Sequence, residues 1–308
     1  MKTAPIPVIV IAGPTGAGKS ALAVAVAQAL DGVIINADSR QVYADFPIIT
    51  AQPDTSDLAS VPHSLYGFLP CHEKLSAGMY ADMAAKEIDA VREKGKCPVL
   101  VGGTGLYLQT LLQGIAPIPP VAPAVSAQWQ ARLAAEGAPA LHALLSRRDP
   151  QTAARLHPND SQRIVRALEV LEGTGKPLGY WHALPLPPAR YAALQLHTAM
   201  SLSTLEPRLE KRIDIMLEKG ALEEARAAYA LCSKPDAPGW SGIGCAELFS
   251  VLTGKTSLAE SKTAWIHNTR TYAKRQITWF KRDKNLVTVD PEDIHSATAL
   301  CRKFYQVV

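Results

Sequence analysis

Short apolar runs alternate with stretches of helical character along the first third of the chain. Residues 6–12 (IPVIVIA) are apolar at every position, the pattern of a strand buried on both faces of a parallel sheet. The alanine-rich stretch 20–30 then predicts a helix. Similar apolar runs occur at 32–36 (GVIIN) and 97–103 (CPVLVGG), with a helix predicted over 76–94 between them. This order predicts an α/β fold with a parallel sheet core flanked by helices.

The pattern changes after this region, where two proline-rich segments bracket a block without strand-like runs. The first segment is IAPIPPVAPA at 115–124, and the second is LPLPPAR at 184–190. Between them the apolar spacing is helical. We therefore expect an inserted all-helical domain over residues 117–190.

Beyond the insert, the chain is predicted to return to the sheet once and then to be mostly helical. Residues 193–200 are apolar enough to re-enter the sheet as a strand, and helices are predicted over 205–230 and 258–282. The expected organisation is a discontinuous core made of residues 1–116 and 191–308, interrupted by the helical insert.

Composition excludes several classes of protein. At 308 residues with 47% hydrophobic content, the chain can fill about two domain cores, so global disorder is excluded. No apolar run approaches the ~18 residues of a membrane span, and no cleavable leader is recognisable, so we expect a cytoplasmic protein. Five scattered cysteines without a CxxC pair support neither a disulfide framework nor a zinc ribbon. Because no coiled-coil seam is present, we expect a monomer.

Charge is divided unevenly along the chain, although the net charge is only +4. Residues 1–116 carry 8 basic and 10 acidic groups, whereas residues 117–190 carry 8 and 5, and residues 191–308 carry 16 and 13. The basic surplus therefore lies wholly outside the first third. The charge by itself favours no particular partner.

The strongest chemical signal is the pattern Gly13-x4-Gly18-Lys19-Ser20 between the first strand and the first helix. From average residue frequencies, a chance match in a chain of this length is expected roughly once in a hundred. The glycines allow backbone N–H groups to converge on phosphate oxygens at a helix N-terminus. Lys19 supplies positive charge, and the Ser20 hydroxyl can bind Mg²⁺. The loop predicts phosphate binding without identifying the phosphate compound.

A nucleotide hydrolase or kinase of this class also needs a metal-binding acid at the end of a neighbouring strand. The third apolar run ends instead in Gly102-Gly103-Thr104, so that acid is missing there. The strand-terminal acid nearby is Asp38, after the second apolar run. The carboxyl ends of such strands form the ligand crevice, so Asp38 is expected to face the phosphate loop. A helix N-cap is the alternative role for this residue.

Six blocks of sequence, in order, identify a family. The blocks are GPTGAGKS, ADSRQVY, VGGTGLYLQTLLQG, HPNDSQRIVRALEV, RLEKRIDIMLEKG and TRTYAKRQITWFK. Only the first block is specific when taken alone, but the occurrence of all six in this order is very specific. With these blocks the chain closely resembles the tRNA dimethylallyltransferases, also called isopentenyl-tRNA transferases, from Gly13 to about Arg282.

The resemblance implies transfer of the dimethylallyl group of dimethylallyl diphosphate to the exocyclic amine of the adenine 3′ of the anticodon in tRNA. It implies that the phosphate loop holds a diphosphate leaving group with Mg²⁺, which accounts for the missing acid. Asp38 would accept the amine proton, and Thr15 and Arg212 would assist departure of the diphosphate. The implied diphosphate site is Gly13, Pro14, Thr15, Gly16, Ala17, Gly18, Lys19, Ser20 (also the Mg²⁺ contact) and Arg208.

The implied tRNA contacts lie in four places. Two follow predicted strands, one lies in the helical insert, and one lies in the most basic stretch of the chain, residues 261–282, which contains no acid. They are Asp38, Ser39, Arg40, Gln41, Thr104, Gln162, Arg163, Ile164, Val165, Arg166, Lys274, Arg275 and Gln276. One departure from the family pattern is Gln52, where a lysine is usual, which puts an RNA contact at that position in doubt.

Two other functions are compatible with the phosphate loop. One is a small-molecule kinase that uses ATP, and the other is a non-catalytic RNA-binding protein whose phosphate loop is vestigial. The motif order favours the prenyltransferase.

Overall fold

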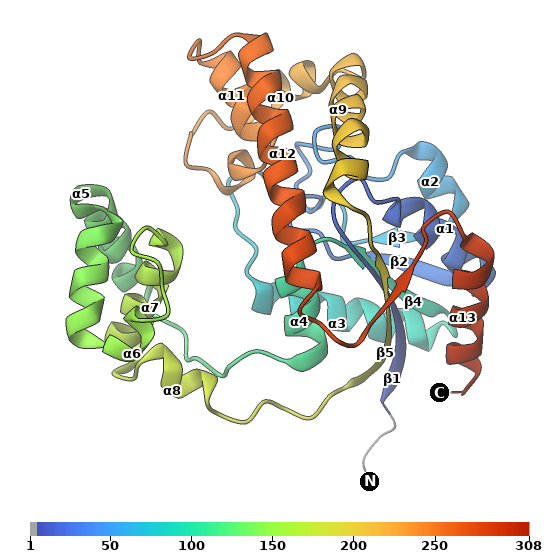
Figure 1. Ribbon diagram of the computed structural model, residues 1–308, viewed down its shortest axis with the longest axis horizontal. Coiled ribbons are helices and arrows are strands. Elements are labelled where there is room, and N and C mark those ends of the chain that lie inside the picture. Colours follow the sequence, from blue (N-terminus) through green and yellow to red (C-terminus); the bar gives the residue numbers. More distant parts are fainter. Residues whose placement is uncertain (1–4, 308) are drawn as a thin grey trace. The chain divides into compact units, whose positions relative to one another are not determined.

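A six-stranded parallel sheet forms the centre of the larger of two compact units (Figure 1). The computed structural model describes residues 5–307 of the chain. The larger unit comprises the described residues up to Leu112 and from Ala189 onward, and the smaller unit is Gln113–Pro188. The strands are β1 (Ile6–Ala12), β2 (Gly32–Asn36), β3 (His63–Ser64), β4 (Cys97–Gly102), β5 (Tyr191–Thr198) and β6 (Leu286–Val289). Their order across the sheet is β3-β2-β4-β1-β5-β6, which confirms the predicted α/β class.

The helices of the described residues account for most of the remaining chain. They are α1 (Lys19–Ala29), α2 (Thr55–Ser60), α3 (Ala77–Glu93), α4 (Gly105–Gln113), α5 (Pro123–Arg148), α6 (Pro150–Ala153), α7 (Ser161–Thr174), α8 (Leu178–His182), α9 (Leu202–Glu218), α10 (Ala221–Leu231), the 3₁₀ helix η1 (Pro238–Ser241), α11 (Cys245–Leu252), α12 (Leu258–Phe280) and α13 (Ile294–Val307). The helix predicted over 205–230 is two helices, because Gly220 adopts a left-handed φ of 96° between them.

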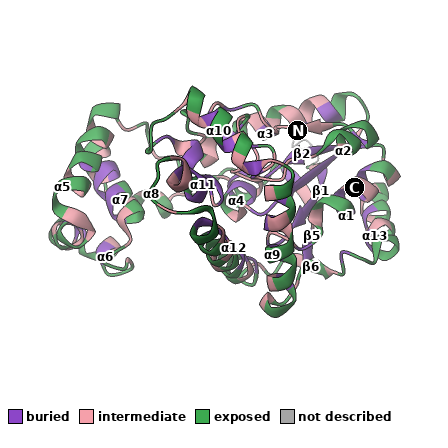
Figure 2. Cartoon of the chain, turned by 90° about the horizontal axis from the view of Figure 1, so that it is seen from above, coloured by how far each residue is buried: buried purple, intermediate pink, exposed green. Residues whose placement is uncertain are grey.

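The sheet is buried on both faces, as its apolar strands require (Figure 2). Side chains of β1 alternate between two cores: Val8 and Val10 pack with α3 and α4, whereas Ile9 and Ile11 pack with α1 and α13. β1 lies between β4 and β5, so its carboxyl end, where the phosphate loop begins, opens between two other strand ends. This central position is what the ligand crevice of such a sheet requires.

A second layer of helices, α9 to α12, packs on the segment that follows β2. Their shared core contains Phe46, Trp240 and Trp265, and the rings of Phe46 and Trp240 meet edge-on at 4.9 Å between centroids. This core ties the loop after Asp38 to α9 and α12. The two helices thereby bring their polar side chains to the carboxyl edge of the sheet.

The smaller unit is helical and has a core of its own. The helix α5 is kinked, because Gly137 has non-helical dihedral angles (φ 79°, ψ 163°). Trp129 lies in the centre and is 1% exposed. It packs with Leu141, Leu145, Ile164 and Leu168 of α5 and α7.

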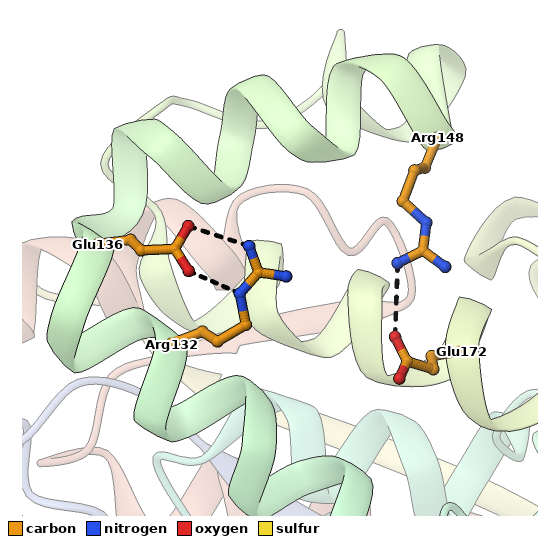
Figure 3. Close-up of polar contacts among 4 residues, drawn as sticks. All are labelled: Arg132, Glu136, Arg148 and Glu172. Carbon is orange, nitrogen blue, oxygen red and sulfur yellow. Dashed lines mark hydrogen bonds and ion pairs between the residues drawn. The ribbon is translucent and has the colours of Figure 1, made fainter.

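Two arginines of this helical unit make ion pairs with glutamates of the same unit (Figure 3). Arg132 donates through two nitrogens to Glu136, one turn along α5, and Arg148 reaches Glu172 of α7 at 3.4 Å. Both guanidinium groups also lie over the ring of Trp129, at 4.8 and 6.0 Å from its centroid. Both arginines thus combine an ion pair with a cation–π contact to the buried Trp129.

Over the described range, residues 5–307, no helix has the length and apolar character needed to cross a membrane.

Candidate active site at the carboxyl edge of the sheet

The loop between β1 and α1 has the geometry of a phosphate-binding loop. Gly16 and Gly18 adopt left-handed φ angles of 80° and 77°, which side chains other than glycine rarely tolerate. Lys19 begins α1, and its Nζ donates to the carbonyl of Pro14 at 2.7 Å, so the ammonium folds back over the loop. The positive end of the α1 dipole and this ammonium therefore face the same space.

Asp38 is held at the end of β2 by a buried asparagine. Asn36 accepts from the Asp38 N–H through Oδ1 at 2.8 Å, and donates through Nδ2 to the carbonyl of Leu65 at 2.9 Å. Asp38 Oδ1 in turn accepts from the N–H of Arg40 at 2.8 Å. The next helix begins only at Thr55, so Asp38 is not a helix cap. Its second carboxylate oxygen remains available to a ligand.

A single cavity of about 290 Å³ brings these parts together. The phosphate loop forms one wall, Asp38 contributes from β2, and Arg208 and Arg212 contribute from α9. The lining residues are Thr15, Gly16, Ala17, Gly18, Lys19, Ser20, Ala21, Asp38, Gln41, Thr50, Val101, Gly102, Arg208 and Arg212. Of the predicted diphosphate-site residues, Thr15 to Ser20 and Arg208 line this cavity together with Asp38 and Arg212, whereas Gly13 and Pro14 are not among its lining residues.

The cavity carries an excess of positive charge that the protein itself does not neutralise. Burial lowers the pKa of Lys19 to about 8, an effect that Asp38 opposes and Arg212 reinforces. Burial also lowers the pKa of Arg212, and Asp38 again opposes the change. Within residues 5–307, neither cation has an ion-pair partner, whereas Arg208 is exposed and paired with Glu292 at 3.0 Å. Two desolvated cations around one space define an anion site.

The end of β4 explains why an acid is absent there. A Cβ atom on Gly102 would overlap the carbonyl of Ala37, and one on Gly103 would overlap the amide of Gln276. No side chain fits at Gly102, because the backbone at the β2 exit closes directly over it, whereas a side chain at Gly103 would have to displace the amide of Gln276. The missing metal-binding carboxylate is thus a packing requirement of this site.

Several residues expected at the tRNA surface also make hydrogen bonds between loops, and their contact with tRNA stays a prediction. The Thr104 hydroxyl accepts from the N–H of Ser39 at 2.9 Å, which joins the exits of β4 and β2. Arg40 donates to the carbonyl of Pro238 and the hydroxyl of Ser241, at 3.3 and 3.0 Å. Gln41 lines the cavity, and its amide donates to the carbonyls of residues 50 and 51.

The remaining predicted tRNA contacts differ in how far their side chains are exposed. Gln162, Arg163 and Arg166 are exposed on α7, and Lys274 and Arg275 are exposed on α12. In contrast, the side chains of Ile164, Val165 and Gln276 are 0%, 2% and 4% exposed, so they offer no surface to RNA. The prediction is corrected at these three positions. Gln52, which replaces a usual lysine, donates to the carbonyl of Tyr43 at 2.8 Å and so stabilises a loop.

Four lining residues were not foreseen: Ala21, Thr50, Val101 and Gly102. Val101 and Gly102 close β4, and the rule that ligands bind at strand carboxyl ends could have identified them. Thr50 reaches the cavity through the fold of the loop after Asp38, which has no local sequence signal.

The fold and cavity define a class: a protein with a phosphate-loop α/β core whose anion site faces an aspartate in place of a metal-binding strand acid. Comparison with known proteins identifies the family. The model of the IPP transferase family matches residues 41–283. The chain belongs to this family.

Curated relatives and solved structures agree with this assignment. The chain is 59% identical to a tRNA dimethylallyltransferase of Oleidesulfovibrio alaskensis, over 94% of this chain and 95% of the relative. It is 55% identical to one of Nitratidesulfovibrio vulgaris, over 97% and 94%. The crystal structure of the full-length tRNA isopentenylpyrophosphate transferase of Bacillus halodurans matches with a TM-score of 0.72 at 30% identity, covering 98% of both chains. A eukaryotic dimethylallyltransferase acting on tRNA matches with a TM-score of 0.79 at 31% identity, covering 94% of this chain and 75% of that one.

Proposed function

We propose that this chain is a tRNA dimethylallyltransferase. It transfers the dimethylallyl group of dimethylallyl diphosphate to the exocyclic N6 amine of the adenosine 3′-adjacent to the anticodon. The C–O bond to the diphosphate breaks, the N6–C bond forms, one amine proton leaves, and diphosphate is released. The observation that carries this proposal is the cavity in which the unpaired cations Lys19 and Arg212 face the carboxylate of Asp38.

The cations suit the leaving group. Negative charge develops on the diphosphate as the C–O bond breaks, and preorganised positive charge in a desolvated site stabilises it strongly. Lys19, Arg212 and the N–H groups at the start of α1 supply that charge in the proposed reaction. Arg208 is the secondary cation, because its ion pair with Glu292 must open before it can contribute fully.

Asp38 suits the nucleophile. The adenine amine is weakly nucleophilic because its lone pair is delocalised into the ring, so a base must take its proton as the new bond forms. One oxygen of Asp38 is fixed by the Arg40 N–H, which orients the carboxylate and leaves the other for the amine. The backbone N–H of Thr15 is bonded to Gln276, so the Thr15 hydroxyl is the group left to contact the leaving oxygen.

The donor set of the cavity fits Mg²⁺ held largely through the substrate. Ser20 lines the cavity and offers an exposed hydroxyl at the first turn of α1. Residues 5–307 contain no cluster of three His, Cys, Asp or Glu side chains suited to a metal. Mg²⁺ accepts such sites because it keeps several waters and binds substrate phosphates. When bound, the ion would neutralise charge on the diphosphate.

The proposed tRNA surface uses the exposed cations of α12 and α7. Lys274 and Arg275 of the larger unit suit contacts with tRNA phosphates, and Arg163 and Arg166 of the helical unit suit the backbone of the anticodon loop. The reacting base of a single-stranded loop can be splayed out and carried to the carboxylate without opening a duplex.

The test compares two donors. The protein is incubated with unmodified tRNA and either dimethylallyl diphosphate labelled in the prenyl group or ATP labelled in the terminal phosphate. Label in tRNA from the prenyl donor, on the N6 amine by mass spectrometry of nucleosides, is the expected result. Phosphate transfer from ATP would favour the kinase, and tRNA binding without transfer from either donor would favour an RNA-binding protein.

A further inference from the structure

One buried side chain joins the phosphate loop to the exit of β4. Gln276 lies in the last turns of α12 and is 4% exposed. Its Oε1 accepts from the backbone N–H of Thr15 at 2.9 Å, and its Nε2 donates to the carbonyl of Gly103 at 2.9 Å. Three segments far apart in the sequence therefore meet at a single amide.

The surroundings admit little besides glutamine. A Cβ on Gly103 would overlap Nε2 of Gln276, so a glycine at position 103 allows the side-chain amide to come this close. A methionine has the same reach without donor or acceptor. A glutamate keeps an acceptor for Thr15 but places a second oxygen against the carbonyl of Gly103. Donor and acceptor on one side chain are thus both required.

The amide also decides which groups of Thr15 face the cavity. In a phosphate loop, successive backbone N–H groups ordinarily point at the anion. Here the N–H of Thr15 is turned toward α12 instead, which fixes the orientation of the residue and its hydroxyl. The same amide fixes the carbonyl that precedes Thr104, whose hydroxyl holds Ser39 beside Asp38.

We propose that Gln276 is a positioning residue for the transfer reaction, which sets Thr15 and the phosphate loop against the strand exits that carry Asp38. This inference rests on the proposed function. Gln276 touches neither substrate, so it acts on the rate of transfer through Thr15 and leaves tRNA affinity to its exposed neighbours Lys274 and Arg275.

The test measures single-turnover transfer with enzyme in excess, whose rate constant does not depend on the fraction of protein that is folded. Gln276→Met is expected to lower this rate constant at least ~10-fold, since small misplacements at reacting centres are costly. The KM for tRNA stays within about 2-fold of the wild type, because uniform binding is retained.

Gln276→Glu is the second variant and is expected to lower the rate constant as well. Thr278→Ala, an exposed change two residues on whose hydroxyl bonds only to Lys274, is the matched control with an unchanged rate.

A double-mutant cycle with Thr15→Val separates positioning from general destabilisation. If Gln276 acts through Thr15, then the pair Thr15→Val and Gln276→Met is no slower than the slower single variant. Fully multiplicative effects, or rate constants for both Gln276 variants within about 2-fold of the wild type, would overturn the proposal. If the wild-type protein transfers no prenyl label, the proposed function itself fails and this inference falls with it.

Discussion

Asp38 and Arg212 face one cavity from different layers of the fold, Asp38 at the end of β2 and Arg212 on α9. Burial lowers the pKa of Arg212, and the carboxylate of Asp38 partly restores it. The two groups are thus coupled without an ion pair between them. This arrangement keeps the arginine available to an incoming anion and the carboxylate available to a proton.

The two arginines of α9 should differ in importance. Arg212→Met removes a desolvated cation, and we expect the transfer rate constant to fall by ~10²-fold or more, the scale of a missing transition-state donor. Arg208→Met removes an exposed cation already paired with Glu292, and we expect a change below ~10-fold. Single-turnover assays of both variants measure the difference. The reverse ranking would show that Arg208 is the main leaving-group cation.

The lowered pKa of Lys19 predicts a pH dependence of diphosphate binding. The ammonium of the free protein loses its proton as the pH rises through about 8, so affinity for diphosphate should fall above that pH. Isothermal titration calorimetry from pH 7 to 10 measures the affinity for diphosphate at each pH. The Lys19→Met variant is the control, because diphosphate itself gains and loses protons in the same way with both proteins. A Lys19→Met variant with the same pH profile as the wild type would contradict the assignment.

The same pKa predicts the pH dependence of stability in the absence of ligand. The unfolded chain holds the Lys19 proton more tightly than the folded protein, because the pKa rises from about 8 toward 10.5 on unfolding. The Lys19 contribution to the unfolding free energy therefore increases between these pH values. Urea unfolding at pH 7.5 and 10 should show this increase in the wild type and lose it in Lys19→Met.

The close approach of the Ala37 backbone to the end of β4 predicts that Gly102 cannot be replaced without loss of stability. Gly102→Ala places a methyl group on the Ala37 carbonyl, and we expect a decrease of about 1–3 kcal/mol in the unfolding free energy, the usual cost of overpacking. Gly78→Ala is the control, because the nearest atom to its added Cβ is the Ser76 hydroxyl at 3.9 Å. Denaturant unfolding compares them. Equal stability of the two variants would mean that the two strand exits are not in contact.

The exposed cations of α12 predict the salt dependence of tRNA binding. Neutralising Lys274 or Arg275 should weaken binding, and the slope of log K against log salt should decrease by about 1 for each phosphate that the variant no longer neutralises. Arg226→Met, on α10 and paired with Glu223, is the control that should leave the slope unchanged. Filter binding over a salt series measures the slopes. An unchanged slope in the α12 variants would place the tRNA elsewhere.

The parts of the fold that could be predicted are those with a local pattern. The continuous apolar run of β1, the glycine loop and the helix after it can each be recognised from a pattern of neighbouring residues. The helix predicted to start at Ser76 begins at Ala77, with Ser76 as its N-cap. The edge strand β6 was not predicted, because it has four residues and none is fully buried. The strand β3 has only two residues. It is defined by its pairing with β2, because two residues are too few to show a strand pattern in the sequence.

Site residues could be predicted where a sequence motif lies at the end of a predicted strand. They could not be predicted where tertiary packing determines the position of a side chain. Asp38 and the phosphate loop follow from strand ends, but the role of Gln276 does not follow from the basic stretch around it. Its burial could have been read from helical spacing, since it lies three residues from Ala273 and four from Phe280, which are both buried. Thr50 had no such signal, because its place depends on how the whole loop after β2 packs against α9 to α12.

In the proposed reaction, Asp38 takes the amine proton beside a diphosphate held by Lys19 and Arg212. The most direct test of this step is single-turnover transfer by Asp38→Asn, with tRNA binding measured on the same preparation and the exposed Asp82→Asn as control. We expect the variant to bind tRNA like the wild type and to transfer the prenyl group ~10²-fold or more slowly, the scale of general-base catalysis. A variant that transfers at the wild-type rate would contradict the account and leave Asp38 with a purely structural role.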